Sequence, residues 1–235
     1  MAGGMSSSLF RHGRRRDGFP PSLWLLPPPG ALAQALQTLI STTLPKRIPG
    51  TVPDFQPHIT ISSGIPVKPG DDFKSLLAEI KLPDQPPIIL FKRVRYGTAL
   101  WTKITLEINK STSLKNLAVA CRAAIVPGVD EAKAREWVEN YTTPAESGEQ
   151  GFIPHLSLVY WDEDIHKPEF DSVRFGVHSD VTDAGVKCED GWKGEDVDNV
   201  EVGDMAGWKG GKLVIVDTTQ PVEAWKTSIL AEREL

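Results

Sequence analysis

Pro57-His58-Ile59-Thr60-Ile61-Ser62 reads proline, histidine, apolar residue, hydroxyl residue, apolar residue, hydroxyl residue. A later segment, Pro154-His155-Leu156-Ser157-Leu158, repeats the first five positions of this order. Polar and apolar residues alternate with a period of two in both segments, which is typical of a β-strand with one buried face. A strand would therefore place each histidine on the same face as the hydroxyl residue two positions later.

The two histidine–hydroxyl pairs, His58 with Thr60 and His155 with Ser157, combine side chains with useful chemistry. An imidazole can accept or donate a proton near neutral pH, because its unperturbed pKa lies near about 6.5. A hydroxyl beside it can donate a hydrogen bond to an anion. If the two strands lie side by side, two imidazoles and two hydroxyls would line one pocket. We therefore predict His58 and His155 as catalytic residues and Thr60 and Ser157 as substrate-binding residues.

The paired segments resemble the two H-x-[ST]-x motifs of the 2H phosphoesterase superfamily, and within it the plant and fungal cyclic phosphodiesterases. The resemblance implies a hydrolase that opens nucleoside 2',3'-cyclic phosphates to the 2'-phosphate, and also ADP-ribose 1'',2''-cyclic phosphate. It links the protein to the metabolism of tRNA-splicing by-products. It further implies acid–base catalysis by the two histidines, and this scheme needs no metal and no other cofactor.

The pattern His155-x-Ser157-x-x-Tyr160 also resembles these cyclic phosphodiesterases. The resemblance implies that Tyr160 lies at the substrate. Simple alternation along a strand would put Tyr160 on the face opposite His155. This assignment therefore requires a β-bulge or the end of the strand between the two residues.

We predict an α+β fold with two similar lobes, each an antiparallel sheet with flanking helices, and the motif strands at the cleft between them. The order strand, helix, histidine strand occurs twice, as a weak internal repeat. The strands are expected at residues 22–26, 57–62, 88–94, 100–108, 154–158, 212–217 and 222–230. The helices are expected at residues 31–44, 71–80, 113–125, 130–141 and 169–186.

Composition suggests three regions. We expect residues 1–20 to form a disordered leader, because they are rich in Gly, Ser and Arg and contain no acid before Asp17. Residues 21–235 would form a single bilobal domain. Within it, residues 188–212 are rich in Gly, Asp, Glu and Lys and are expected to form a flexible, irregular surface loop. Its tryptophans, Trp192 and Trp208, would either cover a pocket or anchor the loop.

Charge and composition also bear on partners. The chain of 235 residues is 40% hydrophobic and 24% charged, as in an ordinary soluble protein, and its net charge is −5. That charge argues against a general nucleic-acid binder, although a small nucleotide needs only a local site. We therefore expect a small cyclic phosphate as substrate, no stable nucleic-acid partner and a monomer. No apolar run approaches the length of a membrane span.

The leader does not show the apolar segment of a signal peptide. Its arginines and the absence of acids before Asp17 would also fit a transit peptide. The resemblance to fungal relatives implies a location in the Golgi apparatus, although no targeting signal supports it. The cytoplasm is the expectation otherwise.

The remaining histidines, His12, His166 and His178, have no Cys, Asp or His partner at the spacing of metal ligands, so we expect surface positions and no metal site. Cys121 falls on the apolar face of its expected helix and is expected to be a buried core thiol.

Three alternatives remain open. The protein could process RNA ends with 2',3'-cyclic or 2',5' linkages, which would require a basic track beside the cleft. It could be a non-catalytic nucleotide- or RNA-binding module on the same fold. The motif segments could also be two amphipathic strands with exposed histidines.

Overall fold

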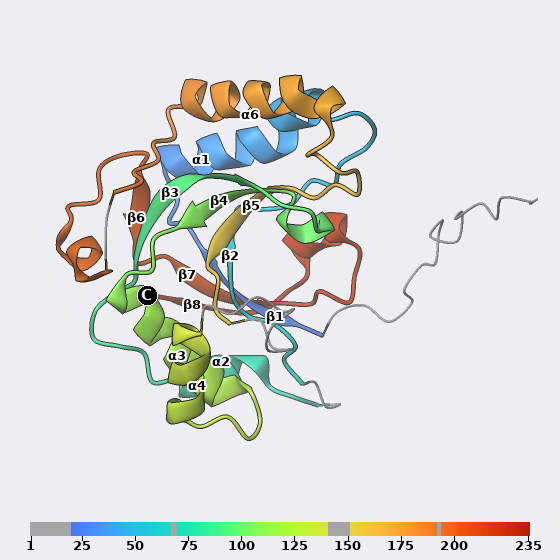
Figure 1. Cartoon of the computed structure of the whole chain (residues 1–235). Helices are drawn as coiled ribbons and strands as arrows, with labels where there is room; N and C mark the ends of the chain where they lie inside the picture. The colour runs from blue at the N-terminus through green and yellow to red at the C-terminus, as the bar shows by residue number, and fades with distance from the viewer. Residues whose placement is uncertain (1–19, 67–69, 141–150, 192–193) are drawn as a thin grey trace, which may run out of the picture.

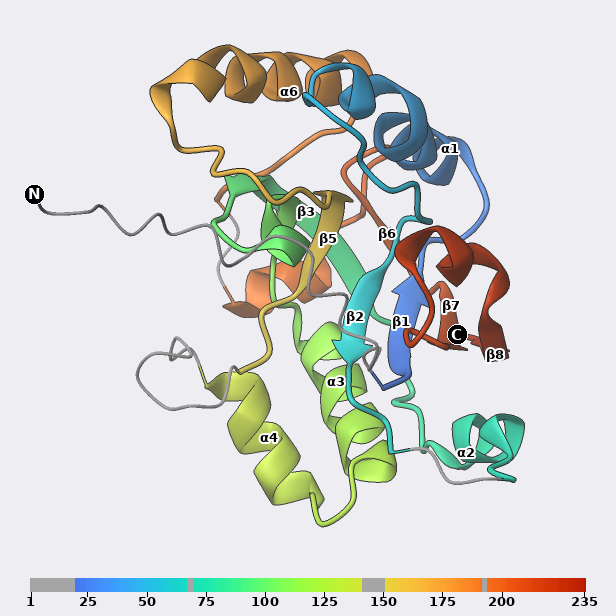
Figure 2. The same ribbon diagram turned by 90° about the vertical axis from the view of Figure 1, so that its right-hand side faces the viewer.

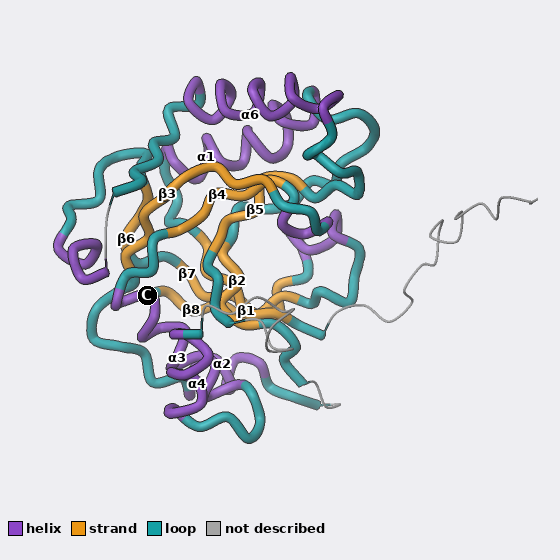
Figure 3. The backbone as a smooth tube through the Cα atoms, in the orientation of Figure 1, coloured by secondary structure: helices purple, strands orange, loops and turns teal. Residues whose placement is uncertain are grey.

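A computed structural model describes residues 20–66, 70–140, 151–191 and 194–235 (Figure 1). Residues 1–19 of the expected leader lie outside this part of the chain, as does Trp192. In the described residues, a single curved antiparallel sheet of eight strands occupies the centre of the molecule, with helices at both ends (Figure 3). This arrangement confirms the predicted α+β class.

The strand order across the sheet is β6-β3-β4-β5-β2-β1-β7-β8. The strands are β1 (Ser22–Leu26), β2 (Ile59–Ser62), β3 (Ile88–Tyr96), β4 (Ile104–Ile108), β5 (His155–Val159), β6 (Gly207–Lys209), β7 (Lys212–Val216) and β8 (Ile229–Glu234). The two predicted lobes are the two four-stranded halves of this order. They are joined through β2 and β5, so the motif strands are direct neighbours at the centre of one sheet.

The predicted internal repeat is visible in the pairing of the strands. In one half the motif strand β2 pairs with β1, which precedes α1 (Ala31–Thr38). In the other half the motif strand β5 pairs with β4, which precedes α3 (Thr112–Ile125). Each half therefore reads strand, helix, motif strand, and the two motif strands meet at the junction.

The helices lie in two groups. The first group, α1 and α6 (Asp171–Asp183), lies at one end of the molecule. At the other end lie α2 (Phe73–Glu79), α3 and α4 (Glu131–Glu139), and Figure 2 shows the same separation from the side. None of the helices among the described residues is long and apolar enough to cross a membrane.

Side-chain caps fix the first turns of three helices. The carboxylate of Asp72 accepts hydrogen bonds from the backbone N–H groups of Lys74 and Ser75 at the start of α2. Ser111 caps α3 and Asp130 caps α4 in the same manner. Each cap satisfies backbone donors that the helix itself cannot satisfy. The helix expected at residues 71–80 therefore begins directly after Asp72.

The apolar residues of the motif strands are buried, as their alternation predicts. Ile59, Ile61, Leu156 and Leu158 are at most 1% exposed and belong to the main hydrophobic core. Removing this surface from water is the main contribution to folding. The register of both strands is therefore fixed, because a shift by one residue would bring the histidines into the core.

Two expected strands differ from the structure. Residues 100–108 were expected to form one strand, but Leu100–Thr102 is a turn of 3-10 helix and only Ile104–Ile108 is extended. Residues 222–230 were also expected to form a strand. Val222–Thr227 is instead a 3-10 helix, and β8 begins at Ile229. In the 3-10 helix the buried side chain of Trp225 donates a hydrogen bond from Nε1 to the carbonyl oxygen of Gln220.

The segment 188–212, expected to be an irregular loop, contains ordered structure. Gly207–Lys209 forms β6 and pairs with β3. The side chain of Trp208 is 4% exposed and packs edge-on against Phe91, so this tryptophan anchors the segment to the core. Farther along, the carboxylate of Asp198 accepts hydrogen bonds from the backbone N–H groups of Thr112 and Ser113 at the start of α3.

Candidate active site

The register between the motif strands places each histidine opposite a hydroxyl residue. Ile59 is the direct partner of Leu156 across β2 and β5. In an antiparallel pair, moving one residue along each strand brings His58 opposite Ser157 and Thr60 opposite His155. The four polar side chains therefore form a compact group on one face of the sheet.

Both imidazoles are held by the same local hydrogen bond. Nδ1 of His58 lies 2.8 Å from the carbonyl oxygen of Gln56, and Nδ1 of His155 lies 2.8 Å from the carbonyl oxygen of Ile153. A carbonyl oxygen only accepts, so Nδ1 carries the proton in both rings. The Nε2 atom of each neutral ring therefore holds a free electron pair and can accept a proton.

Burial favours the neutral form of both histidines. The side chain of His58 is 4% exposed, and this burial lowers its pKa to about 4, against the opposing effect of the hydrogen bond to Gln56 and with a smaller contribution from His155. Burial also lowers the pKa of His155, and the nearby charge of Arg95 acts in the same direction. Both rings therefore favour the neutral form near pH 7.

Aromatic side chains surround His58. The indole of Trp24 is stacked on its imidazole, with the ring centroids 3.7 Å apart and the planes 11° apart. Phe55 approaches the same imidazole edge-on and is stacked on Tyr160. Trp225 contacts Trp24 and Tyr160 edge-on. These contacts fix the orientation of the His58 ring.

A cavity of about 640 Å³ brings all of the predicted site residues together. Its lining includes His58, Thr60, His155, Ser157 and Tyr160. The volume is in the range of small-molecule sites. Trp24 and Trp225 also line it, so the cavity combines a polar centre with an apolar wall.

Tyr160 reaches this cavity because β5 contains a bulge. Thr105 pairs with Ser157, but the next residue back on β4, Ile104, pairs with Val159. Leu158 is therefore an extra residue, and the alternation of side chains changes after it. Burial raises the pKa of Tyr160 well above its usual range, and a hydrogen bond with Ser157 only partly offsets this effect. The phenol is therefore a neutral group at the wall of the cavity.

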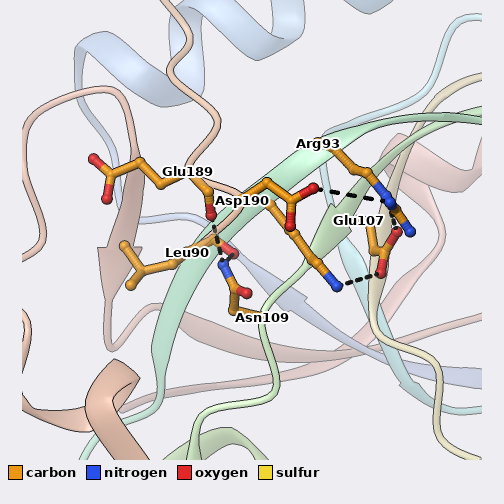
Figure 4. Close-up of polar contacts among 7 residues, drawn as sticks. Leu90, Arg93, Glu107, Asn109, Glu189 and Asp190 are labelled. Atoms are coloured by element: carbon orange, nitrogen blue, oxygen red, sulfur yellow. Dashed lines mark hydrogen bonds and ion pairs between the residues drawn. The ribbon is translucent and has the colours of Figure 1, made fainter. Parts of the chain in front are cut away.

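The carboxylate of Glu107 lies beside His155. Glu107 on β4 is the direct partner of His155 on β5. Figure 4 shows the carboxylate of Glu107 held by Arg93, which also approaches Asp190. Burial raises the pKa of Glu107, but Arg93 and Lys92 outweigh that effect, so the pKa lies below its usual value. Glu107 is therefore ionised beside His155, and the positive charges of Arg93 and Lys92 compensate its negative charge.

The other predicted positions agree with the structure where it describes them. His166 and His178 are exposed, and His12 lies outside the described residues. Cys121 is fully buried and unpaired, and burial raises the pKa of its thiol to about 12. Cys188 is also unpaired. Across residues 20–66, 70–140, 151–191 and 194–235, no group of three or more His, Cys, Asp or Glu side chains could hold a metal ion.

Sequence reasoning missed Trp24, Trp225 and Arg95. Trp24 lies in an expected strand, but its place beside His58 depends on the register between β1 and β2, in which Trp24 pairs with Thr60. Nothing local predicts the place of Trp225, which depends on how residues 222–227 fold back on the sheet. Arg95 lies near the end of β3, beyond the expected limit of that strand.

Comparison with known proteins gives a consistent result. Residues 20–235 match the model of a family described as "Cyclic phosphodiesterase-like protein". A protein of Phaeosphaeria nodorum named 2',3'-cyclic-nucleotide 3'-phosphodiesterase is 30% identical, over 91% of this chain and 98% of that protein. A protein of the same name from Yarrowia lipolytica is 28% identical, over 87% of this chain and 95% of the relative. Another, from Saccharomyces cerevisiae, is 25% identical, over 65% and 69% respectively.

Proposed function

This chain belongs to the family of cyclic phosphodiesterase-like proteins, and on that premise we propose that it hydrolyses nucleoside 2',3'-cyclic phosphates with His58 and His155 as proton carriers. The family and the names of the relatives make it a cyclic phosphodiesterase. One observation carries the assignment of the residues. Two imidazoles on neighbouring strands, each with Nδ1 bound to a carbonyl oxygen, line one cavity together with Thr60 and Ser157.

The reaction divides two proton transfers between the histidines. One neutral imidazole takes a proton from a water molecule at Nε2 as the water oxygen attacks phosphorus. The bond from phosphorus to O3' breaks, and the second imidazole, in its protonated form, gives a proton to O3'. The products are a 2'-phosphate and a free 3'-hydroxyl. Cleavage at O3' is the reaction that the name of the relatives describes.

Substrate binding helps one of the two histidines to become protonated. Burial lowers the pKa of both histidines in the free site. The cyclic phosphate carries a negative charge, and an anion beside an imidazole favours its protonated form. Binding therefore helps one histidine to take up the proton that it later donates. Either histidine can serve as base, because each has the same tautomer and a neighbouring hydroxyl.

Thr60 and Ser157 stabilise the phosphoryl oxygens. Each hydroxyl lies opposite a histidine and lines the same cavity. Hydrogen bonds to these oxygens matter most when negative charge increases on them in the transition state. Tyr160 would contact the substrate at the wall of the cavity. Its neutral phenol adds a further donor next to Ser157.

The range of substrates and the cellular role are part of the same proposal. ADP-ribose 1'',2''-cyclic phosphate contains the same type of strained cyclic diester, so the same two proton transfers would open it. Such substrates connect the enzyme with by-products of tRNA splicing. Action as a monomer and without a metal remains a prediction, as does the location in the Golgi apparatus that the resemblance implies.

The deciding experiment measures turnover of adenosine 2',3'-cyclic phosphate by the wild type and by the His58→Ala, His155→Ala and double variants. Each single change should nearly abolish hydrolysis, because it removes one of the two proton carriers. The double change should cost little more, since residues that act as one unit are not additive. The product should be the 2'-phosphate, identified by chromatography against both isomers.

A chelator and a matched variant complete this test. EDTA should leave the rate unchanged, because the proposed scheme uses no metal. His178→Ala removes an exposed imidazole on α6 and should keep wild-type turnover. Near-normal hydrolysis by either single active-site variant would refute the two-histidine mechanism. Binding of the cyclic phosphate without turnover by the wild type would favour a non-catalytic nucleotide-binding module.

A further inference from the structure

A second cavity, of about 270 Å³, lies next to the main site and shares His155 with it. It is lined by the ends of β3 and β4, by the turn that connects them, by residues 153–155 and by His166. Thr98 and Thr102 line both cavities, so the two spaces adjoin along this turn. The proposed reaction does not use this second cavity.

The position of Arg95 in this cavity follows from the register of the sheet. Arg95 pairs with Thr105 across β3 and β4, and Thr105 pairs with Ser157 across β4 and β5. Directly paired residues point to the same face of an antiparallel sheet. Arg95, Thr105 and Ser157 therefore form a row that leads to the candidate active site. The charge of Arg95 is near enough to affect His155.

Arg95 differs from Arg93, the other arginine on this face of β3. Arg93 is bound to the carboxylate of Glu107 at 2.8 Å and approaches Asp190. Within the described part of the chain, the guanidinium of Arg95 makes no hydrogen bond or ion pair. Glu107 also lines the cavity, but Arg93 and Lys92 already neutralise it. The unneutralised charge in this space is therefore positive.

Hydrogen bonds from a buried lysine hold the turn that carries Thr98 and Thr102. Lys103 is fully buried, and its Nζ donates hydrogen bonds to the carbonyl oxygens of Thr98 at 2.9 Å and Glu163 at 2.5 Å. A Cβ atom added at Gly97 would lie 2.2 Å from the carbonyl oxygen of Thr102, so the two sides of the turn are in close contact. The hydroxyl groups of Thr98 and Thr102 are thus presented on a fixed backbone.

We propose that Arg95, with Thr98, Thr102 and Thr105, forms a subsite for a second phosphate on the substrate, at the 5' position of the ribose that carries the cyclic phosphate. A guanidinium can bind two phosphate oxygens at once, and threonine hydroxyls can donate to the remaining oxygens. The subsite rests on the proposed function, because it takes the cyclic phosphate at His58 and His155 as the first anchor. The 5'-phosphate can be terminal in a mononucleotide or part of the diester at an RNA end.

The test compares three substrates that differ only at the 5' position. They are adenosine 2',3'-cyclic phosphate, its 5'-phosphorylated form, and the dinucleotide ApA ending in a 2',3'-cyclic phosphate. We expect the KM of the wild type for the 5'-phosphorylated mononucleotide to be about 10-fold below that for the unphosphorylated one. Arg95→Gln should reduce this ratio to about one. Arg95→Lys should restore part of it.

A charge-matched control separates a local contact from the general field of the protein. Arg135→Gln changes the net charge equally but lies on α4, where Arg135 forms an exposed ion pair with Glu131. This variant should keep the wild-type ratio. If the KM for the dinucleotide is lowered as much as the KM for the 5'-phosphorylated mononucleotide, RNA ends are identified as the source of the second phosphate. If the KM for the dinucleotide is not lowered, free mononucleotides are identified as that source.

Equilibrium binding tests the subsite without turnover. Adenosine 2',5'-bisphosphate should bind to the wild type about 10-fold more tightly than adenosine 2'-phosphate by calorimetry. This advantage should disappear in Arg95→Gln and persist in Arg135→Gln. Equal affinities in the wild type, or an advantage that survives in Arg95→Gln, would overturn the proposed subsite. Loss of hydrolysis of every substrate, with the binding advantage intact, would instead overturn the proposed function alone.

Discussion

At the scale of single residues, the proline before each histidine has a structural role. Pro57 lies between Gln56 and His58, and Pro154 lies between Ile153 and His155. A proline fixes its own φ and keeps the preceding residue extended. The geometry that joins each imidazole to the carbonyl oxygen two residues earlier is therefore restricted before the sheet forms. This explains physically why both motif segments begin with proline.

The hydroxyl residues allow a test that separates charge stabilisation from proton transfer. Thr60→Ala or Ser157→Ala should lower kcat about 10²- to 10³-fold, because each change removes one donor to the phosphoryl oxygens. Hydrolysis that needs one neutral and one protonated histidine should give a bell-shaped pH–rate profile, and this shape should persist in both variants, since both proton carriers remain. Thr182→Ala, which removes an exposed hydroxyl on α6, is the control. Unchanged turnover of adenosine 2',3'-cyclic phosphate in both active-site variants would exclude these hydroxyls from the site.

The residues of the site could be predicted from sequence to different degrees. The shared face of His58 with Thr60, and of His155 with Ser157, follows from alternation alone, because side chains two apart on a strand share a face. The stacking of Trp24 on His58 depends on the register between β1 and β2, which a single segment does not contain. The row of Ser157, Thr105 and Arg95 likewise depends on the registers between β5, β4 and β3, which no single segment contains.

At the scale of secondary-structure elements, two β-bulges position groups that simple alternation would misplace. The bulge in β5 brings Tyr160 to the cavity of His155. In β3, Phe91 pairs with Ile108 and Arg93 with Glu107, so Lys92 is an extra residue. Lys92 and Arg93 therefore both reach the carboxylate of Glu107. Bulges arise from the pairing of two strands, which is why the sequence of one strand does not reveal them.

A substitution in the edge strand β6 can test whether the segment 188–212, expected to be a flexible loop, is docked on β3. A Cβ atom at Gly207 would lie 1.9 Å from the carbonyl oxygen of Ile89 on β3. Gly207→Ala must therefore separate β6 from β3, and we expect it to lower the free energy of unfolding by about 2 kcal/mol in urea denaturation. Gly203→Ala is the matched control, since no atom lies within 4 Å of its added Cβ. Equal, small effects of both changes would mean that β6 is not docked in solution.

At the scale of the whole molecule, the candidate active site lies where two similar halves join. The repeated order of elements was sufficient to predict two related halves and to place the motif strands between them. It did not predict that β2 and β5 would pair directly and unite the halves in one sheet. Edge strands carry unpaired backbone groups, and pairing them satisfies both edges at once. This pairing also sets the separation of His58 and His155, so the fold and the chemistry depend on the same contact.

The buried histidines should make the whole molecule sensitive to acid. Burial lowers the pKa of His58 to about 4 in the folded protein, whereas an unfolded histidine titrates near about 6.5. Between these values the unfolded state binds more protons, so stability is complete above about pH 6.5 and decreases as the pH falls toward 4. This shift corresponds to a loss of about 3 kcal/mol. His58→Gln removes the titrating group, so its stability in urea should depend less steeply on pH across this window.

The slope that remains in His58→Gln would come from His155, whose pKa is also lowered by burial. Carboxylates with lowered pKa values, such as Asp180 beside Arg47, lose their contribution only at more acidic pH, so they act outside most of this window. His178→Gln removes an exposed imidazole from α6 and should keep the wild-type slope. An identical slope in the wild type and in His58→Gln would mean that His58 is already solvated in the folded protein. Burial would then not be the cause that keeps the His58 imidazole neutral near pH 7.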